Sequence, residues 1–189
     1  CRTVLVVAAE KATQLAPQED YKRCNLFGDG ASAFVMTASR QADGDQFLFF
    51  DQCTDPEGLA YIRQTENGFD QDGPRVHKYV GSVVPARLAD ILRRLDLDAA
   101  EVDHFIPHQP SGKTIDLLED RLRRLCPSLR TGIVRRHVAT MGNMSCASTG
   151  HLLSSLVHEG VAESGDICLV YSFGSGMSFG GYGLRMFRD

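Results

Sequence analysis

Residues 102–120 read VDHFIPHQPSGKTIDLLED and decide how the chain folds. The apolar run at 104–107 is typical of a short buried strand, and it ends at the ionisable His108. A Gln-Pro-Ser-Gly turn follows, and apolar residues from Ile115 to Leu125 then recur at helical spacing. A buried strand, a turn and an amphipathic helix in this order are the repeating unit of a layered α/β domain.

The rest of the chain continues this alternation. Apolar runs predict further strands at 3–9, 31–39, 47–53, 132–139, 166–173 and 178–187. Helical spacing predicts helices over 76–95 and 113–125, and a third helix with Ser145 as its N-cap. Residues 54–75 are polar and indicate a long surface excursion. We therefore expect an α/β domain with a mainly parallel sheet.

Composition narrows the class of protein. The chain has 189 residues, a net charge of -4 and no long basic run, which argues against nucleic acid as the main partner. No apolar run approaches the roughly 20 residues that a membrane helix needs. The first residues also lack a signal-peptide pattern. These features favour a globular protein of the cytoplasm that does not contact a membrane.

The six cysteines indicate a reducing compartment. They stand at positions 1, 24, 53, 126, 146 and 168, and none forms a C-x-x-C pair, so a zinc site is not predicted. Several lie within apolar runs, and we expect them to be small buried hydrophobic residues.

Two short motifs match without their structural context. GDGASA at 28–33 fits the dinucleotide-binding pattern, but a β-prone stretch follows it where a helix is required. GMSFG at 176–180 fits the nucleophile elbow of hydrolases, but another strand pattern follows it and the chain then ends. We interpret both as turns between strands.

Three loops that follow predicted strands carry residues suited to catalysis. They are PHQPSG with His108, MGNMSCAS with Asn143, and FGSGMSFGG at 173–181. In open α/β sheets, functional groups gather beyond the carboxyl ends of the strands. Taken singly, a His at a strand end is more often structural, and an Asn before a helix is usually a cap or turn residue. Their combination is what indicates function.

The motifs LFGDGASA, FIPHQPSGKTI, GNMSCAS and FGSGMSFG stand in the order and rough spacing of a known family. Over nearly its whole length the chain resembles the β-ketoacyl-acyl-carrier-protein synthase III family of the thiolase superfamily. The resemblance implies a thiolase-like fold of αβαβα layers, built from two similar halves. Residues 1–45 would be the end of the N-terminal half, and residues 46–189 the C-terminal half.

The resemblance also implies a reaction. In the family, a cysteine takes an acyl group from acyl-coenzyme A. Malonyl-acyl carrier protein then loses carbon dioxide and attacks that acyl group in a decarboxylative Claisen condensation. Neither a tightly bound cofactor nor a metal is implied. His108 and Asn143 match the family's His and Asn, which would donate hydrogen bonds to the thioester oxygen as it becomes an enolate.

Other positions match the family's binding residues. The backbone N–H of Ser175 aligns with the second oxyanion donor, where the family usually has Gly. Ser111 falls where the family contacts the pantetheine arm, and His77 falls at the entrance of the primer pocket, which is usually aromatic. Lys113 and Lys78 align with basic positions that meet the acidic carrier protein. They are equally consistent with solvated surface lysines.

The nucleophile is not among the matched residues. The family's cysteine begins a helix that precedes the strand matching VLVVAAE, and Cys1 abuts this strand with no room for such a helix. Cys146 stands where the family has a small residue, and we interpret it as a packing residue. We expect a front half, in a longer chain or a separate subunit, to supply the nucleophile. We also expect a homodimer or heterodimer, and an exposed apolar face on this chain alone.

Two alternatives remain open at this stage. The chain could belong to an acyltransferase of secondary metabolism that uses the same His and Asn with another acceptor, which the polar His77 favours. It could also be a non-catalytic partner that stabilises a catalytic subunit, although such a subunit would not need His108 and Asn143. Activity after His108→Ala separates these possibilities.

Overall fold

A computed structural model describes residues 1–14, 16, 25–38, 46–66 and 68–187. The predictions for Cys24 and for the end of the strand expected at 31–39 lie outside the described residues.

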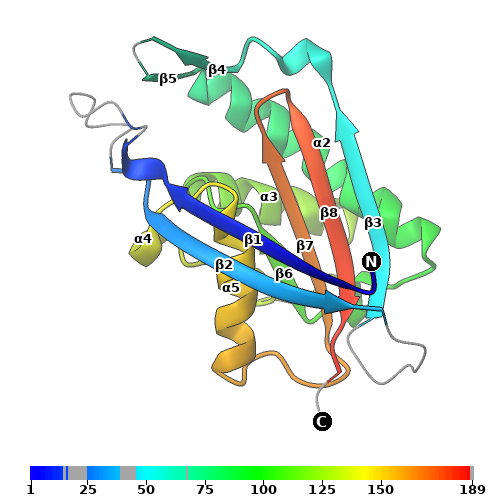
Figure 1. Cartoon of the computed structure of the whole chain (residues 1–189). Helices are drawn as coiled ribbons and strands as arrows, with labels where there is room; N and C mark the ends of the chain where they lie inside the picture. Colours follow the sequence, from blue (N-terminus) through cyan, green and yellow to red (C-terminus); the bar gives the residue numbers. More distant parts are fainter. Residues whose placement is uncertain (15, 17–24, 39–45, 67, 188–189) are drawn as a thin grey trace.

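A four-stranded mixed sheet forms the centre of the fold (Figure 1). Its strand order is β3 (Gln46–Thr54), β8 (Ser178–Arg185), β7 (Ile167–Gly174) and β6 (His104–Pro107). Only β6 and β7 are parallel, while β8 is antiparallel to both of its neighbours. The expectation of a mainly parallel sheet is therefore wrong. The β7–β8 hairpin sets β8 antiparallel to both of its neighbours and so produces a mixed sheet.

Two antiparallel hairpins stand apart from this sheet. One pairs β1 (Thr3–Lys11) with β2 (Asp29–Thr37) over nine residues, and the other pairs β4 (Ile62–Thr65) with β5 (Gly68–Gln71). The β4–β5 hairpin lies within the stretch 54–75, and Ile62, the first residue of β4, is buried, so this stretch is not wholly a surface excursion.

The helices cover both faces of the sheet. They are α2 (Gly73–Arg94), α3 (Gly112–Leu125), α4 (Val138–Met141) and α5 (Ala147–His158), with 3-10 turns at Ala12–Gln14, Pro56–Gly58 and Ala99–Glu101. Helices α2 and α3 lie side by side (Figure 1). The helices predicted over 76–95 and 113–125 are thus confirmed.

Alternation along β7 divides the core in two. Leu169 and Tyr171 face the cluster formed with α2 and α3, whereas Cys168 and Val170 face the cluster formed with α5. This is the two-residue period of a strand buried on both sides. Helix α5 also packs against β2, whose Phe34 joins the second cluster. The layers therefore run helix, sheet, helix, hairpin.

The β1–β2 hairpin is covered on one side only. Leu5 is 65% exposed and Val35 is 69% exposed, although their sequence pattern predicts fully buried strands. The positions of both strands are confirmed, but their complete burial is wrong within the described residues. The expected exposed apolar face is present, and it lies on this hairpin.

Three local predictions are wrong. Residues 132–139 do not form a strand, since only Val134 bridges to Phe105 before α4 begins. Ser145 does not cap α5, because it has a left-handed φ of 49° and Cys146 occupies the N-cap position. Cys168 is buried as expected, but Cys1 and Cys146 are exposed.

An ion-pair network ties α2 to the central sheet. Arg87 donates to both carboxylate oxygens of Asp51 at 2.7 and 2.9 Å, and Tyr171 donates to Asp51 at 2.6 Å. Burial alone would raise the pKa of Asp51, but the hydrogen bonds from Arg87 and Tyr171 outweigh burial and hold this pKa below its ordinary value. The network joins α2, β3 and β7.

We expect Arg87→Met to lower the free energy of unfolding by about 1–3 kcal/mol at pH 7, because it leaves a partly buried carboxylate without its charged donor. The matched control is Arg93→Met on the same helix, whose partner Asp90 lies in an exposed pair. This control should change stability by less than about 0.5 kcal/mol. If urea unfolding gives equal losses of unfolding free energy for the two variants, the buried network contributes no more to stability than an exposed ion pair.

Candidate active site

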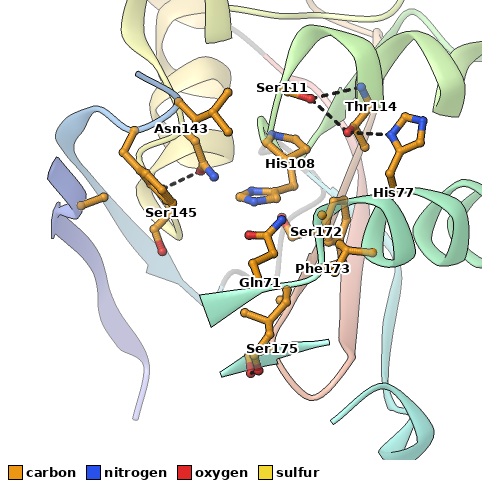
Figure 2. Close-up of a pocket in the computed structure, with 18 of the residues that line it drawn as sticks. Gln71, His77, His108, Ser111, Thr114, Asn143, Ser145, Ser172, Phe173 and Ser175 are labelled. Carbon is orange, nitrogen blue, oxygen red and sulfur yellow. Dashed lines mark hydrogen bonds between the residues drawn. The ribbon is translucent and has the colours of Figure 1, made fainter. Parts of the chain in front are cut away.

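A cavity of about 690 Å³ opens at the carboxyl ends of β6 and β7. Figure 2 shows side chains from separate parts of the chain converging on it. The lining includes Leu26, Phe27, Gln71, His77, His108, Ser111, Lys113, Asn143, Cys146, Ser172, Phe173 and Ser175. The structure thus brings together most of the residues that the sequence singled out.

His108 is held at the floor of the cavity by the strand that precedes it. Its backbone N–H donates to Tyr171 O at 2.8 Å, which continues the pairing of β6 with β7 by one residue. Its ring meets Phe173 edge to face, with ring centroids 5.0 Å apart. Burial lowers the pKa of His108 to about 4. The imidazole is therefore neutral at pH 7 and can donate one N–H.

Asn143 is held by a loop from the β1–β2 hairpin. Its N–H donates to Leu26 O at 2.7 Å, and its carbonyl accepts from Gly28 N at 3.0 Å. Its side-chain Oδ1 accepts from Ser145 N at 2.9 Å, which leaves the amide NH₂ available as a donor. Figure 2 shows this side chain pointing toward His108. Two neutral N–H donors therefore face the same cavity.

Glycine is required where these two loops cross. A Cβ at Gly28 would lie 1.8 Å from Met141 O, and Gly142 has a φ of +70°. These contacts explain Gly28 of LFGDGASA and Gly142 of GNMSCAS by backbone packing.

Ser175 lies at the β7–β8 turn on the edge of the cavity. Its side chain is exposed, and its Oγ donates to Ile62 O at 3.0 Å. Figure 2 shows it well away from Asn143. The role of its backbone N–H as a second oxyanion donor stays a prediction.

Ser111 and His77 meet through a third residue. Thr114 Oγ1 lies 3.0 Å from Ser111 Oγ and 3.1 Å from His77 Nδ1, so a hydrogen-bonded chain crosses one wall of the cavity. Ser111 also caps α3 by accepting from Thr114 N at 3.3 Å. Thr114 was missed from the sequence, where it stands as an ordinary residue in the first turn of a helix.

The two lysines differ in position. Lys113 lines the mouth of the cavity, whereas Lys78 is exposed on α2 and is not part of the cavity lining. Phe173 and Gln71 were also missed as site residues. Phe173 lies in a loop that the sequence did single out, but Gln71 sits in a short polar strand that gave no signal.

Cys146 is the cysteine of the described residues that lines the cavity. It is exposed, so its interpretation as a packing residue is wrong in this chain. Its Sγ donates to Glu10 Oε1 at 2.6 Å. Partial burial of the sulfur, together with the hydrogen bond and the negative charge of Glu10, raises the pKa of the thiol to about 11. A thiol of this kind is a poor nucleophile at pH 7, because the thiolate is the reactive form.

The described residues contain neither a group of three or more side chains placed to hold a metal ion nor a helix long and apolar enough to cross a membrane.

Comparisons with known proteins agree with this geometry. A curated β-ketoacyl-(acyl-carrier-protein) synthase III from Synechococcus sp. is 30% identical over 199 residues, covering 97% of this chain and 58% of the relative. The solved 3-oxoacyl-(acyl-carrier-protein) synthase III from Aquifex aeolicus superposes with a TM-score of 0.88 at 28% identity, covering 97% of this chain and 58% of that one. A priming β-ketosynthase from a polyketide biosynthetic pathway superposes with a TM-score of 0.84 at 29% identity, covering 100% and 58%. The fold is therefore thiolase-like, and the chain spans somewhat more than half the length of these relatives.

Two families match parts of the sequence. Residues 1–56 match 3-oxoacyl-(acyl-carrier-protein) synthase III, and residues 92–186 match the 3-oxoacyl-(acyl-carrier-protein) synthase III C terminal. The second match spans half of the chain and includes both His108 and Asn143. The chain belongs to the 3-oxoacyl-(acyl-carrier-protein) synthase III family.

Proposed function

We propose that this chain forms part of an enzyme that condenses an acyl group with malonyl-acyl carrier protein. The observation that carries the proposal is the convergence of two neutral donors, His108 and Asn143, on one cavity. Family membership supports it, as do relatives named β-ketoacyl- or 3-oxoacyl-(acyl-carrier-protein) synthase III.

The two donors suit a decarboxylation. When the bond between the malonyl carboxylate and its α-carbon breaks, carbon dioxide leaves and the electron pair passes to the thioester oxygen as an enolate. Donors already in place favour this charge as it develops. The enolate carbon then attacks the acyl thioester on a cysteine, a carbon–carbon bond forms, and the cysteine thiolate leaves. A neutral His108 carries one ring N–H, and it can donate this N–H to the enolate without a change in protonation state.

The other cavity residues receive binding roles. Ser111 would contact the pantetheine arm and His77 the entrance of the acyl pocket, with Thr114 holding both. The backbone N–H of Ser175 would bind the acyl carbonyl. Lys113 on α3, at the cavity mouth, and Lys78 on α2 would attract the acidic carrier protein.

The nucleophile would come from outside these 189 residues. The high thiol pKa of Cys146 argues against it as the nucleophile, and a preceding segment or a separate subunit would supply a reactive cysteine. Residues 1–45 would then belong to an N-terminal thiolase-like half and residues 46–189 to the C-terminal half. The exposed apolar face of the β1–β2 hairpin favours association with further protein, in a homodimer or heterodimer of such units.

His77 favours an alternative function, in which the acyl group passes to another kind of acceptor. His77 makes the cavity wall polar, and a priming ketosynthase of a polyketide pathway is among the similar structures. Transfer of the acyl group to another acceptor is therefore the alternative function. The proposal fails if the enzyme, once acylated, forms product with a hydroxyl or amine acceptor and not with malonyl-acyl carrier protein.

The test of the proposed function is the intact mass of the purified protein, and of everything that copurifies, before and after incubation with a short acyl-coenzyme A. We expect a gain of one acyl group on a cysteine outside residues 1–189. A gain on this chain would overturn the assignment of the nucleophile. No gain on any component would count against acyl transfer.

We expect His108→Ala and Asn143→Ala each to lower the rate of malonyl decarboxylation and condensation by about 10²–10³, because each removes one donor to the enolate. Acylation by acyl-coenzyme A should change far less, since the enolate forms only in the second half-reaction. Single-turnover assays of the two half-reactions check this. Unchanged condensation in His108→Ala would instead support a non-catalytic partner subunit.

The lowered pKa of His108 predicts an unusual pH profile. Its imidazole stays neutral until the pH falls toward about 4, so the condensation rate should show no loss assigned to His108 near the ordinary histidine value of about 6.5. NMR titration of labelled histidines, with His108→Asn to assign the signal, measures the pKa directly. An inflection near 6.5 for this ring would contradict the prediction.

A further inference from the structure

The residue that follows His108 in the sequence is fully buried and has no role in the chemistry proposed above. Gln109 is 0% exposed, yet it lies directly beside a cavity residue. A buried amide is costly unless its donors and acceptor find partners, so its contacts show what it holds together.

Both ends of the Gln109 amide are used. Its Nε2 donates to Pro107 O at 2.8 Å and to Arg135 O at 3.3 Å, while its Oε1 accepts from His137 N at 3.0 Å. Pro107 is the last residue of β6, immediately before His108. Arg135 and His137 belong to a different segment. The side chain therefore bridges the end of β6 to the segment 135–137.

The segment 135–137 leads directly to Asn143. The carbonyl of His137 accepts from Thr140 N and Met141 N at 3.0 and 2.9 Å, which starts the single turn of α4. Gly142 and Asn143 follow this turn. The position at which α4 begins thus sets where the Asn143 amide enters the cavity.

A second set of hydrogen bonds holds the segment 135–137 from the side of α5. His137 Nε2 lies 3.0 Å from Ser148 O, and Ser148 Oγ accepts from Met144 N, the residue after Asn143, at 2.9 Å. His137 is thus fixed through its backbone by Gln109 and through its ring by α5. The segment has little freedom once the Gln109 bonds are made.

We propose that Gln109 is a positioning residue that sets the spacing between the His108 imidazole and the Asn143 amide. This inference rests on the proposed function, in which both groups bind one enolate oxygen. Two donors share one oxygen only if both lie within hydrogen-bond reach of it, and a displacement of about 1 Å can cost about 10²-fold in rate.

The test uses Gln109→Met in the complete enzyme, because Met has similar length and no hydrogen-bonding amide. We expect the rate of decarboxylation and condensation to fall about 10- to 100-fold. Acylation by acyl-coenzyme A, and the KM for malonyl-acyl carrier protein, should change less than about 3-fold, since ground-state binding does not need both donors. Leu122→Val, a buried change on α3 remote from the cavity, is the matched control and should alter melting temperature without this split.

A double-mutant cycle separates positioning from general loss of structure. If Gln109 acts through Asn143, the loss caused by Gln109→Met should nearly disappear in an Asn143→Ala background. A full, additive loss in that background would overturn the inference. So would a Gln109→Met enzyme that condenses at the rate of the unmodified one.

Gln109→Glu tests the inference through the pH dependence of activity. Protonated Glu can donate once to Pro107 O, but the ionised form places a negative charge against two carbonyl oxygens. Activity of the folded variant should therefore fall as the pH rises, with a limb that the unmodified enzyme lacks. A profile without this limb would count against the bridge.

A crystal structure of the Gln109→Met variant tests the inference independently of the proposed function. In Gln109→Met, the distance between the His108 ring and the Asn143 amide should change by more than about 0.5 Å, the tolerance of a preorganised site. An unchanged distance overturns the inference whatever the reaction. An enzyme that never acts on malonyl-acyl carrier protein, but shows the shift, would overturn only the proposed function.

Discussion

The candidate site depends on one short backbone pairing, in which Phe27 bridges in parallel to Asn143. Bonds from Asn143 N to Leu26 O, and from Gly28 N to Asn143 O, hold the loop from both sides. The pairing joins a segment near the start of the chain to a residue more than a hundred positions later. It is possible only because Gly28 has no Cβ, since one there would occupy the place of the Met141 carbonyl. The β1–β2 hairpin is therefore part of the site as well as a layer of the fold.

Helix α5 turns this local pairing into a stable arrangement. It packs on the central sheet through Leu152, Leu153 and Leu156, and on the hairpin through Phe34. The same helix begins just after the loop of Asn143 and receives the ring of His137 at Ser148 O. The hydrophobic contacts fix the distance between the central sheet and the β1–β2 hairpin. At that distance the hydrogen bonds can orient the side-chain amide of Asn143. Packing and site geometry are consequently set by the same element.

Much of the arrangement could be predicted from the sequence, because its signals are local. The spacing of apolar residues located α2 and α3, and the motifs around His108 and Asn143 identified the two donors that the cavity brings together. The errors lie where partners distant in sequence decide the structure. Residues 132–139 are apolar enough for a strand, but only Val134 forms a bridge of that kind, and Gln109 binds the backbone of Arg135 and His137 just after it. The exposure of β1 likewise depends on what covers it, which no strand pattern reveals.

The short strand β6 shows why residue type alone could not assign the chemistry, since a histidine stands at its first position and another just after its last. His104 is buried with charged partners, for its Nε2 lies 2.9 Å from Asp166 and Arg135 Nε donates to its Nδ1 at 2.9 Å. Because Arg135 donates to Nδ1, the proton of neutral His104 must be on Nε2, and both nitrogens are committed to structure. His108 lies against the ring of Phe173 and lines the cavity. Burial without a charged partner keeps His108 neutral, and its N–H remains available for a ligand that brings its own negative charge. Histidine is thus a structural group at the start of β6 and a candidate donor just after its end. The difference lies in the neighbours supplied by β7 and by the segment after Ile133.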